Sequence, residues 1–66
     1  MKPHPGQLRV WTFGDGDQKR YGAPFLVLEV RRDNTPDSTK VLENRKIYSV
    51  WTRTVEVESE AISEAR

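Results

Sequence analysis

Few motifs in this 66-residue sequence combine the residue types and the spacing that catalysis or metal binding requires. Asp15 and Asp17 flank a glycine, a spacing that could begin a calcium-binding loop. Gln18-Lys19-Arg20 follows and adds two cations instead of further acidic ligands, so the pair is interpreted as a turn. His4 is the single histidine and lies between two prolines, without the fixed neighbour that a general base needs. Cysteine is absent, which excludes disulfides and thiolate sites. We therefore expect no enzyme activity, cofactor, metal or small-molecule substrate.

Charge is unevenly distributed and gives the first hint of a binding surface. Residues 1–53 hold ten Lys and Arg against six Asp and Glu, whereas residues 54–66 hold one Arg against four Glu. Six cations fall near the central predicted strands: Arg31, Arg32, Lys40, Arg45, Lys46 and Arg53. We expect them either to form a basic patch for nucleic acid or an acidic protein, or to lie on a solvated face of mixed charge. The sequence pI of about 8.1 is lower than that of dedicated nucleic-acid-binding domains.

The aromatic residues are predicted to lie mostly in the core, because large side chains are scarce in this chain. Tyr21 lies in a polar segment and Trp51 at a strand end, so these two could flank a groove like the one that holds proline-rich peptides in SH3 domains. The alternatives are a half-buried loop anchor for Tyr21 and a core position for Trp51.

Hydrophobic residues alternate with polar ones in several short segments, as they do in strands. The predicted strands cover residues 8–13, 25–32, 39–43, 46–51 and 54–58. Asn44-Arg45 is predicted to be a hairpin turn, and Thr52-Arg53 a single 3₁₀ turn. Residues 59–66 favour a short helix that frays unless Ile62 packs against the domain.

Five short strands with these connections predict an all-β fold, a small SH3-like barrel with a short C-terminal helix or frayed tail. A five-stranded OB fold is the alternative, but Asn44-Arg45 leaves no room for its helix. The expected organisation is an N-terminal arm (residues 1–6), the barrel (7–58) and the helical tail (59–66). The predicted core comprises Leu8, Val10, Phe25, Val27, Leu28, Val30, Val41, Ile47, Val50, Val55 and Val57, with Trp11 and Trp51 at the ends. A one-residue slip would exchange the two faces of a strand.

Several short motifs bear a family resemblance. They are Pro5-Gly6, Leu26-Val27-Leu28-Glu29-Val30, Lys40-Val41-Leu42, Ile47-Tyr48-Ser49-Val50-Trp51 and Thr52-Arg53-Thr54-Val55-Glu56-Val57. In this pattern the sequence resembles the very short SH3-like proteins of tailed phages, particularly phages of marine bacteria and cyanobacteria. It departs from them at Glu43-Asn44-Arg45-Lys46, where their hairpin reads Trp-Ser-Asp/Asn-Gly. The resemblance implies a small non-enzymatic phage accessory protein and names no ligand.

The expected function is therefore a protein-interaction module that binds a host or virion protein, or a second copy of itself. Nucleic-acid binding through the basic strands is the alternative. The candidate binding residues are Tyr21, Arg31, Arg32, Lys40, Arg45, Lys46, Trp51 and Arg53. No apolar run approaches the roughly 18 residues of a membrane span and the N-terminus is unlike a signal peptide, so the host cytoplasm or the virion is the expected location.

Overall fold

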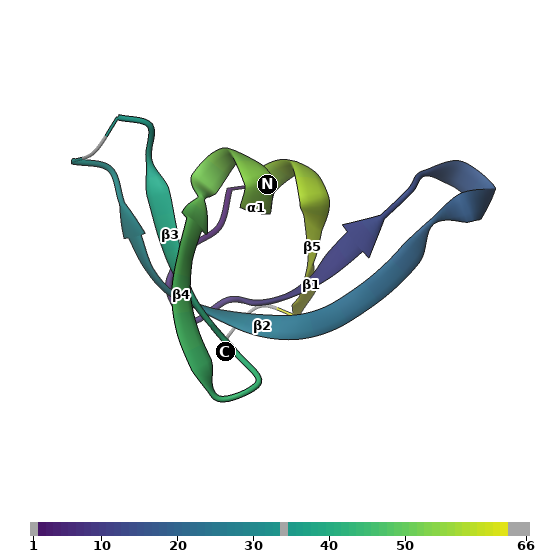
Figure 1. The fold of residues 1–66 in the computed structure, drawn as a ribbon, viewed down its shortest axis with the longest axis horizontal. Coiled ribbons are helices and arrows are strands. Elements are labelled where there is room, and N and C mark those ends of the chain that lie inside the picture. The colour runs from purple at the N-terminus through teal and green to yellow at the C-terminus, as the bar shows by residue number, and fades with distance from the viewer. Residues whose placement is uncertain (1, 34, 64–66) are drawn as a thin grey trace.

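Five antiparallel strands form one sheet in the order β4-β3-β2-β1-β5 in the computed structural model, which describes residues 2–33 and 35–63 (Figure 1). The elements in chain order are β1 (Leu8–Phe13), the 3₁₀ turn η1 (Gly16–Gln18), β2 (Arg20–Arg31), β3 (Ser38–Glu43), β4 (Lys46–Trp51), α1 (Thr52–Glu58) and β5 (Ser59–Ser63). The predicted small, mostly-β fold is confirmed, whereas its one short helix lies at Thr52–Glu58 and not in the C-terminal tail.

Strand β2 is long because it pairs with two neighbours. Its first half pairs with β1 and its second half with β3, and Leu26 has a partner in both, Leu8 and Leu42. Register shifts at Val10/Thr12 and Val27/Glu29 accompany the bend of the sheet. Figure 1 shows the sheet curling so that α1 covers its inner face, while the β1–β2 hairpin extends away from β4.

The C-terminal prediction was wrong in both of its elements. Residues 54–58 belong to the helix α1, and residues 59–63 form strand β5, which pairs with β1. Val55 is fully buried, whereas Val57, which a strand would place on the same face, is 70% exposed. Tertiary contacts therefore override the alternating pattern. The predicted tail continues to residue 66, and its last three residues lie outside the described part.

A buried arginine holds this helix against the sheet. Arg9 is 2% exposed and donates to the Val55 carbonyl at 3.2 Å and the Ser59 carbonyl at 3.0 Å. Its Nε donates to Ser59 Oγ at 2.7 Å, and its Nη1 to Gln7 Oε1 at 2.8 Å. Burial lowers the pKa of Arg9, an effect that the charge of Glu56 partly opposes. The guanidinium remains charged at neutral pH because an arginine loses its proton only at far higher pH.

The core is centred on four fully buried residues from three elements. Phe25, Val27, Val41 and Val55 form it, and the partly buried Trp11, Val30 and Val50 pack against them. All of these residues were predicted to lie in the core or at its ends. For β1, however, the inward and outward faces are the reverse of the prediction. On β1 it is Arg9 and Trp11 that face inward, because Arg9 pairs with Phe25, and Leu8 faces outward.

The outer face carries a row of apolar side chains, of which two, Leu8 and Ile47, were predicted to lie in the core. Leu8, Leu26, Leu42 and Ile47 are successive register partners across β1, β2, β3 and β4, so they form one row on that face. Ile47 is 62% exposed. Val10 and Leu28 are only half-buried, and Trp51 is exposed and fills no end of the core. The predicted core is therefore too large, because a single sheet buries one face and the helix covers it.

The predicted N-terminal arm is attached to the sheet. The Gly6 amide donates to the Val27 carbonyl and the Val27 amide donates to the Gln7 carbonyl, both at 2.9 Å. Pro3 and Gln7 are fully buried. The packed unit therefore begins before residue 7.

The turns predicted at Asp15–Asp17 and Asn44–Arg45 are confirmed, whereas the 3₁₀ turn predicted at Thr52–Arg53 is wrong, because both residues belong to the first turn of α1. Gly14 and Gly16 have positive φ, and the Gln18 amide donates to the Asp15 carbonyl in η1. Asn44 and Arg45 join β3 to β4 with φ of 51° and 65°, the conformation of a two-residue type I′ hairpin.

Arg45 is strained in this turn, because a side chain disfavours the left-handed region that glycine adopts freely. We expect Arg45→Gly to raise the free energy of unfolding by about 0.5–1 kcal/mol. Urea denaturation followed by circular dichroism measures the change. Arg53→Gly, in the helix, is the control and should destabilise by about 1 kcal/mol; a destabilised Arg45→Gly variant would contradict the turn assignment.

Candidate functional site

Strand β4 lies at the end of the sheet order, so one of its edges is not paired within the described residues. Residues that flank a two-residue hairpin form a hydrogen-bonded pair, and such pairs alternate with non-bonded pairs along the ladder. Glu43 and Lys46 flank the turn and form such a bonded pair. The Thr52 amide donates to the Asp37 carbonyl at 3.0 Å, which is where the alternation predicts another bonded pair. The non-bonded positions of β4 direct backbone groups toward the free edge. Ile47 and Ser49 direct both N–H and C=O there. Trp51 directs only its N–H, because it is the N-cap of α1 and its carbonyl accepts the first hydrogen bond of the helix.

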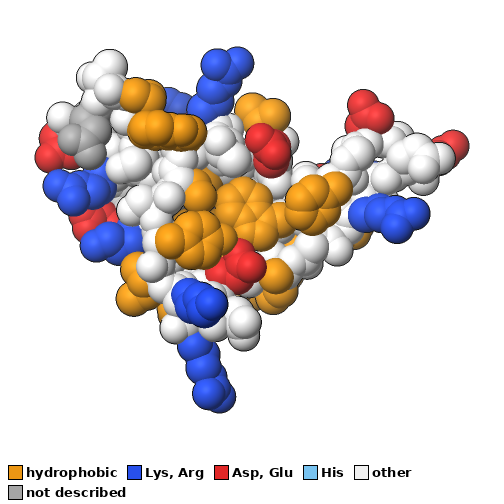
Figure 2. Space-filling model, viewed as in Figure 1, with side chains coloured by type: hydrophobic (Ala, Val, Ile, Leu, Met, Phe, Trp, Pro, Cys, Tyr) orange, Lys and Arg blue, Asp and Glu red, His pale blue; other side chains and the backbone are white. Residues whose placement is uncertain are grey.

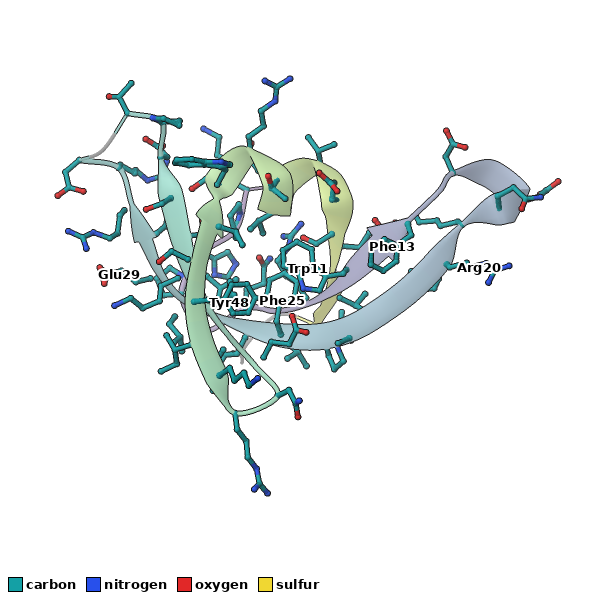
Figure 3. All side chains as sticks on the ribbon, viewed as in Figure 1. Trp11, Phe13, Arg20, Phe25, Glu29 and Tyr48 are labelled. Carbon is teal, nitrogen blue, oxygen red and sulfur yellow. The ribbon has the colours of Figure 1, made fainter. Side chains whose placement is uncertain are left out.

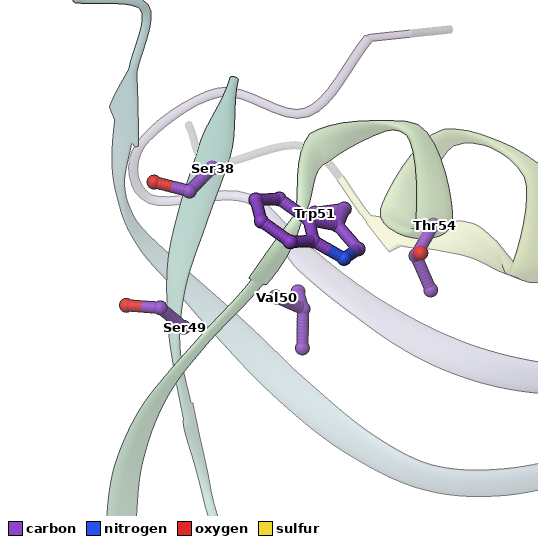
Figure 4. A pocket seen from close by; sticks show the side chains of 5 residues that line it. All are labelled: Ser38, Ser49, Val50, Trp51 and Thr54. Atoms are coloured by element: carbon purple, nitrogen blue, oxygen red, sulfur yellow. The ribbon is translucent and has the colours of Figure 1, made fainter. Parts of the chain in front are cut away.

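An open pocket of about 420 Å³ lies at this edge, where β4 meets α1. Its lining residues are Ser38, Ser49, Val50, Trp51 and Thr54 (Figure 4). Figure 4 shows Val50 and Trp51 between the two serines and Thr54. Trp51 is 58% exposed, although a large aromatic ring is usually buried in a small domain. The site thus combines backbone groups that are not paired within the sheet with the exposed Trp51 side chain beside the pocket.

Two predicted cations share the outer face with Trp51. Lys40 is the register partner of Ser49, and Arg31 is the partner of Ser38, which in turn pairs with Trp51. Arg31 lies 3.9 Å from a Glu29 carboxylate oxygen and 3.7 Å from one of Asp33, contacts too long and exposed to neutralise it strongly. Lys40 has no ion pair among the described residues. Lys40 and Arg31 therefore lie on the outer face near the edge pocket, together with Glu29, which is the register partner of Lys40.

The other predicted binding residues are placed elsewhere. Arg32 follows β2 and Arg53 lies on α1, both near the end of the sheet that carries Trp51. Arg45 and Lys46 lie at the hairpin, at the opposite end of β4. Figure 2 shows Lys and Arg side chains projecting at separate places around the rim of the molecule. The six cations thus do not form the single patch that was one of the expectations.

Tyr21 lies on the part of β2 that pairs with β1, beyond the residues that pair with β3, whereas Trp51 pairs with Ser38 on β3, so the two do not flank one groove. Tyr21 is exposed on the β1–β2 hairpin, opposite Thr12. The Lys19 ammonium lies 5.7 Å from the centre of its ring and also forms an ion pair with Glu60. This contact gives Tyr21 a structural role on the hairpin.

A second feature of the molecule was not predicted, an aromatic strip on the inner face, composed of Phe13, Trp11, Phe25 and Tyr48. Figure 3 shows these rings following one another from β4 toward the β1–β2 hairpin, and Figure 2 shows hydrophobic side chains gathered there around an acidic group. Trp11 and Phe25 are stacked with ring centres 4.2 Å apart. Phe13 lies over Gly22, where a Cβ atom would be 2.6 Å from its ring. Phe13 and Tyr48 are 58% and 38% exposed, so the strip is open to a ligand.

Glu43 lies within this strip and holds two of its rings. Its Oε1 accepts hydrogen bonds from the Tyr48 hydroxyl at 2.6 Å and from Trp11 Nε1 at 2.8 Å. Both hydrogen bonds lower the pKa of Glu43, and the bond from Tyr48 has the larger effect. Burial has the largest effect on the pKa of Tyr48 and raises it, and the hydrogen bond to Glu43 raises it further. The hydroxyl therefore keeps its proton at neutral pH. A carboxylate is therefore fixed between aromatic rings.

The sequence contained a partial signal for this cluster. A two-residue turn at Asn44-Arg45 places Glu43 and Tyr48 on the same face of neighbouring strands, because Glu43 pairs with Lys46 and Tyr48 is two residues farther along. The contribution of Trp11 depends on the face of β1 that points inward, and that face was predicted incorrectly.

No protein-family model, curated protein or solved structure matches this chain. Among residues 2–33 and 35–63, no helix has the length and apolar character needed to cross a membrane.

Proposed function

We propose that this protein is a non-catalytic protein-interaction module that binds an extended segment of a partner protein along the free edge of β4. The observation that carries the proposal is the outward direction of both Ser49 backbone groups and of the Trp51 N–H beside an open pocket. A peptide added as a sixth strand would satisfy those groups, and its alternate side chains would reach the pocket.

The surroundings of the edge define the partner segment. An apolar side chain would fill the space beside Val50 and Trp51. Acidic side chains next to it would face Lys40 and Arg31 on the outer face. The proposed partner segment is therefore extended, apolar at one central position and acidic around it.

We further propose that the sheet is a small SH3-like barrel, and that the protein is a phage or phage-like accessory protein acting on a host or virion protein. The sheet order β4-β3-β2-β1-β5 and the helical turn before the last strand support the barrel. The phage assignment is supported by the sequence resemblance described above. A protein of this kind would act in the host cytoplasm or on the virion.

Nucleic-acid binding is the less favoured function. It would use Lys40, Arg45, Lys46 and Arg53, which form no ion pairs within the described part of the chain. These cations lie at both ends and in the middle of β3 and β4 instead of along one groove. A nucleic-acid partner needs closely spaced cations to release counterions from its backbone.

Ser49→Pro tests the proposed edge. Proline removes the outward amide and places its ring at the edge, but leaves the hydrogen bonds to β3 intact. We expect peptides selected from a random display library of about twelve residues to bind the native protein. The Ser49→Pro variant should bind them roughly tenfold or more weakly, because it loses backbone hydrogen bonds and admits the strand poorly.

Ser49→Ala is the matched control, because it removes the hydroxyl and keeps the amide. Its affinity should stay within about twofold of the native value, since only a weak side-chain contact is lost. The far-UV spectrum of each variant establishes that the sheet is intact. Equal binding by the proline and alanine variants, both folded, would refute strand addition at β4.

A further inference from the structure

The Glu43 carboxylate is charged, partly buried and incompletely paired. Both of its hydrogen bonds, from Tyr48 and Trp11, end on Oε1. Within the described residues, Oε2 accepts no hydrogen bond and no cation forms an ion pair with this carboxylate. Lys46 is its register partner across the hairpin but lies outside ion-pair distance. The strip therefore presents one uncompensated negative charge between two rings.

The rings beside this charge also favour a cation. Aromatic faces carry negative potential, and a cation within about 6 Å of a ring centre is attracted to it. The Tyr48 ring is exposed at the surface, whereas Trp11 is partly buried with one side stacked on Phe25, so Tyr48 offers the open ring face beside Glu43. A neutral apolar ligand would desolvate Glu43 without compensating it, which is costly for a carboxylate.

A planar guanidinium fits these features better than an ammonium ion. It can donate in its plane to a carboxylate oxygen while its face stacks on an aromatic ring. We propose that the aromatic strip binds an arginine side chain of a partner protein, with its guanidinium donating to Oε2 of Glu43 and stacking on Tyr48. This site is independent of the β4 edge, because Glu43 and Tyr48 face inward, whereas the edge pocket is reached through Ser49 and Trp51.

The probe is N-acetyl-arginine amide, with N-acetyl-citrulline amide as an uncharged analogue of nearly the same shape. Titration of the ¹⁵N-labelled protein reports on the indole N–H of Trp11, which donates to Glu43. The Trp51→Phe variant leaves Trp11 as the sole indole and removes any ambiguity of assignment. We expect a saturable shift of the Trp11 signal with arginine, at millimolar affinity, and at least roughly fivefold weaker binding of citrulline.

Glu43→Gln provides the decisive variant, because the glutamine oxygen still accepts from Trp11 and Tyr48 while the charge is lost. We expect it to bind the arginine probe roughly tenfold more weakly. Glu29→Gln, which removes an exposed carboxylate on the outer face, should bind like the native protein. Tyr48→Phe keeps the ring and provides a second test: it should retain the preference for arginine over citrulline.

Three results would overturn the proposal: no saturable shift with arginine, equal binding of citrulline, or unchanged binding by a folded Glu43→Gln variant. None of them bears on strand addition at β4, because the display peptides are tested with Ser49 variants. Loss of peptide binding in the Ser49→Pro variant would likewise leave the arginine titration unchanged.

Discussion

The Arg9→Met variant should lose about 3 kcal/mol of its free energy of unfolding. Methionine replaces the aliphatic part of the side chain and removes the donors to Gln7, Val55 and Ser59. The Val55 carbonyl keeps the hydrogen bond from the Ser59 hydroxyl. The other oxygens lie in buried surroundings, and a buried acceptor left without a donor costs about 1–3 kcal/mol. Relief from burying the guanidinium offsets part of this cost. The free energy of unfolding of a domain of this size is about 3–10 kcal/mol in total, so the variant would be close to unfolding.

Arg31→Met is the matched control, because Arg31 is exposed and its ion pairs are long. It should change stability by less than about 1 kcal/mol. Arg9→Lys keeps the charge, but a single ammonium cannot reach acceptors on two sides as the guanidinium does, so we expect an intermediate loss. Urea denaturation, followed by fluorescence and circular dichroism, measures all three. Native stability in Arg9→Met would mean that the hydrogen bonds of Arg9 do not stabilise the fold.

Strands joined by local turns could be predicted from the sequence. The hairpin strands 39–43 and 46–51 were placed within one residue, because Asn44-Arg45 fixes both their ends and their register. The end of β1 was also correct, because the Gly-Asp-Gly segment terminates it. In each case the information is contained within a few neighbouring residues.

Features that depend on distant partners could not be predicted. The sequence placed Leu8 and Val10 on the core face of β1, which leaves Arg9 on the opposite face, and buried arginines are rare. Its four hydrogen bonds are donated to Gln7, near its own strand, and to Val55 and Ser59 at the end of α1. Strand β5 exists through pairing with β1, about fifty residues earlier. Its local composition favoured a helix, and long-range pairing decided otherwise.

The candidate site was also predictable only where it depends on neighbouring residues. Trp51 was singled out because it ends a strand, and the alternation of bonded pairs from the hairpin gives the direction of the backbone at Ser49 and Trp51. The junction of Trp51 with Thr54 requires the helix that was missed. The sequence drew attention to Glu43 only as part of the hairpin that departs from the phage pattern, and its partner Trp11 is thirty-two residues away.

Val55 and Val57 give the sharpest test of the helix, because a strand would place them on one face and the helix separates them. Val55→Lys would introduce an ammonium at a fully buried position beside the Arg9 guanidinium. An unpaired buried charge costs several kcal/mol, and repulsion from Arg9 adds to it. We therefore expect Val55→Lys to be largely unfolded at 25 °C, as measured by the loss of near-UV circular dichroism and of dispersed amide signals.

Val57→Lys should behave oppositely, although it introduces the same side chain two residues later. Val57 is 70% exposed in the last turn of α1, where a cation interacts favourably with the helix dipole. Its free energy of unfolding should remain within about 0.5 kcal/mol of the native value. A strand over residues 54–58 would instead destabilise both variants alike, since both lysines would enter the core. Comparable losses in the two variants would therefore reject α1, and with it the capping role of Arg9 and the junction that forms the pocket beside Trp51.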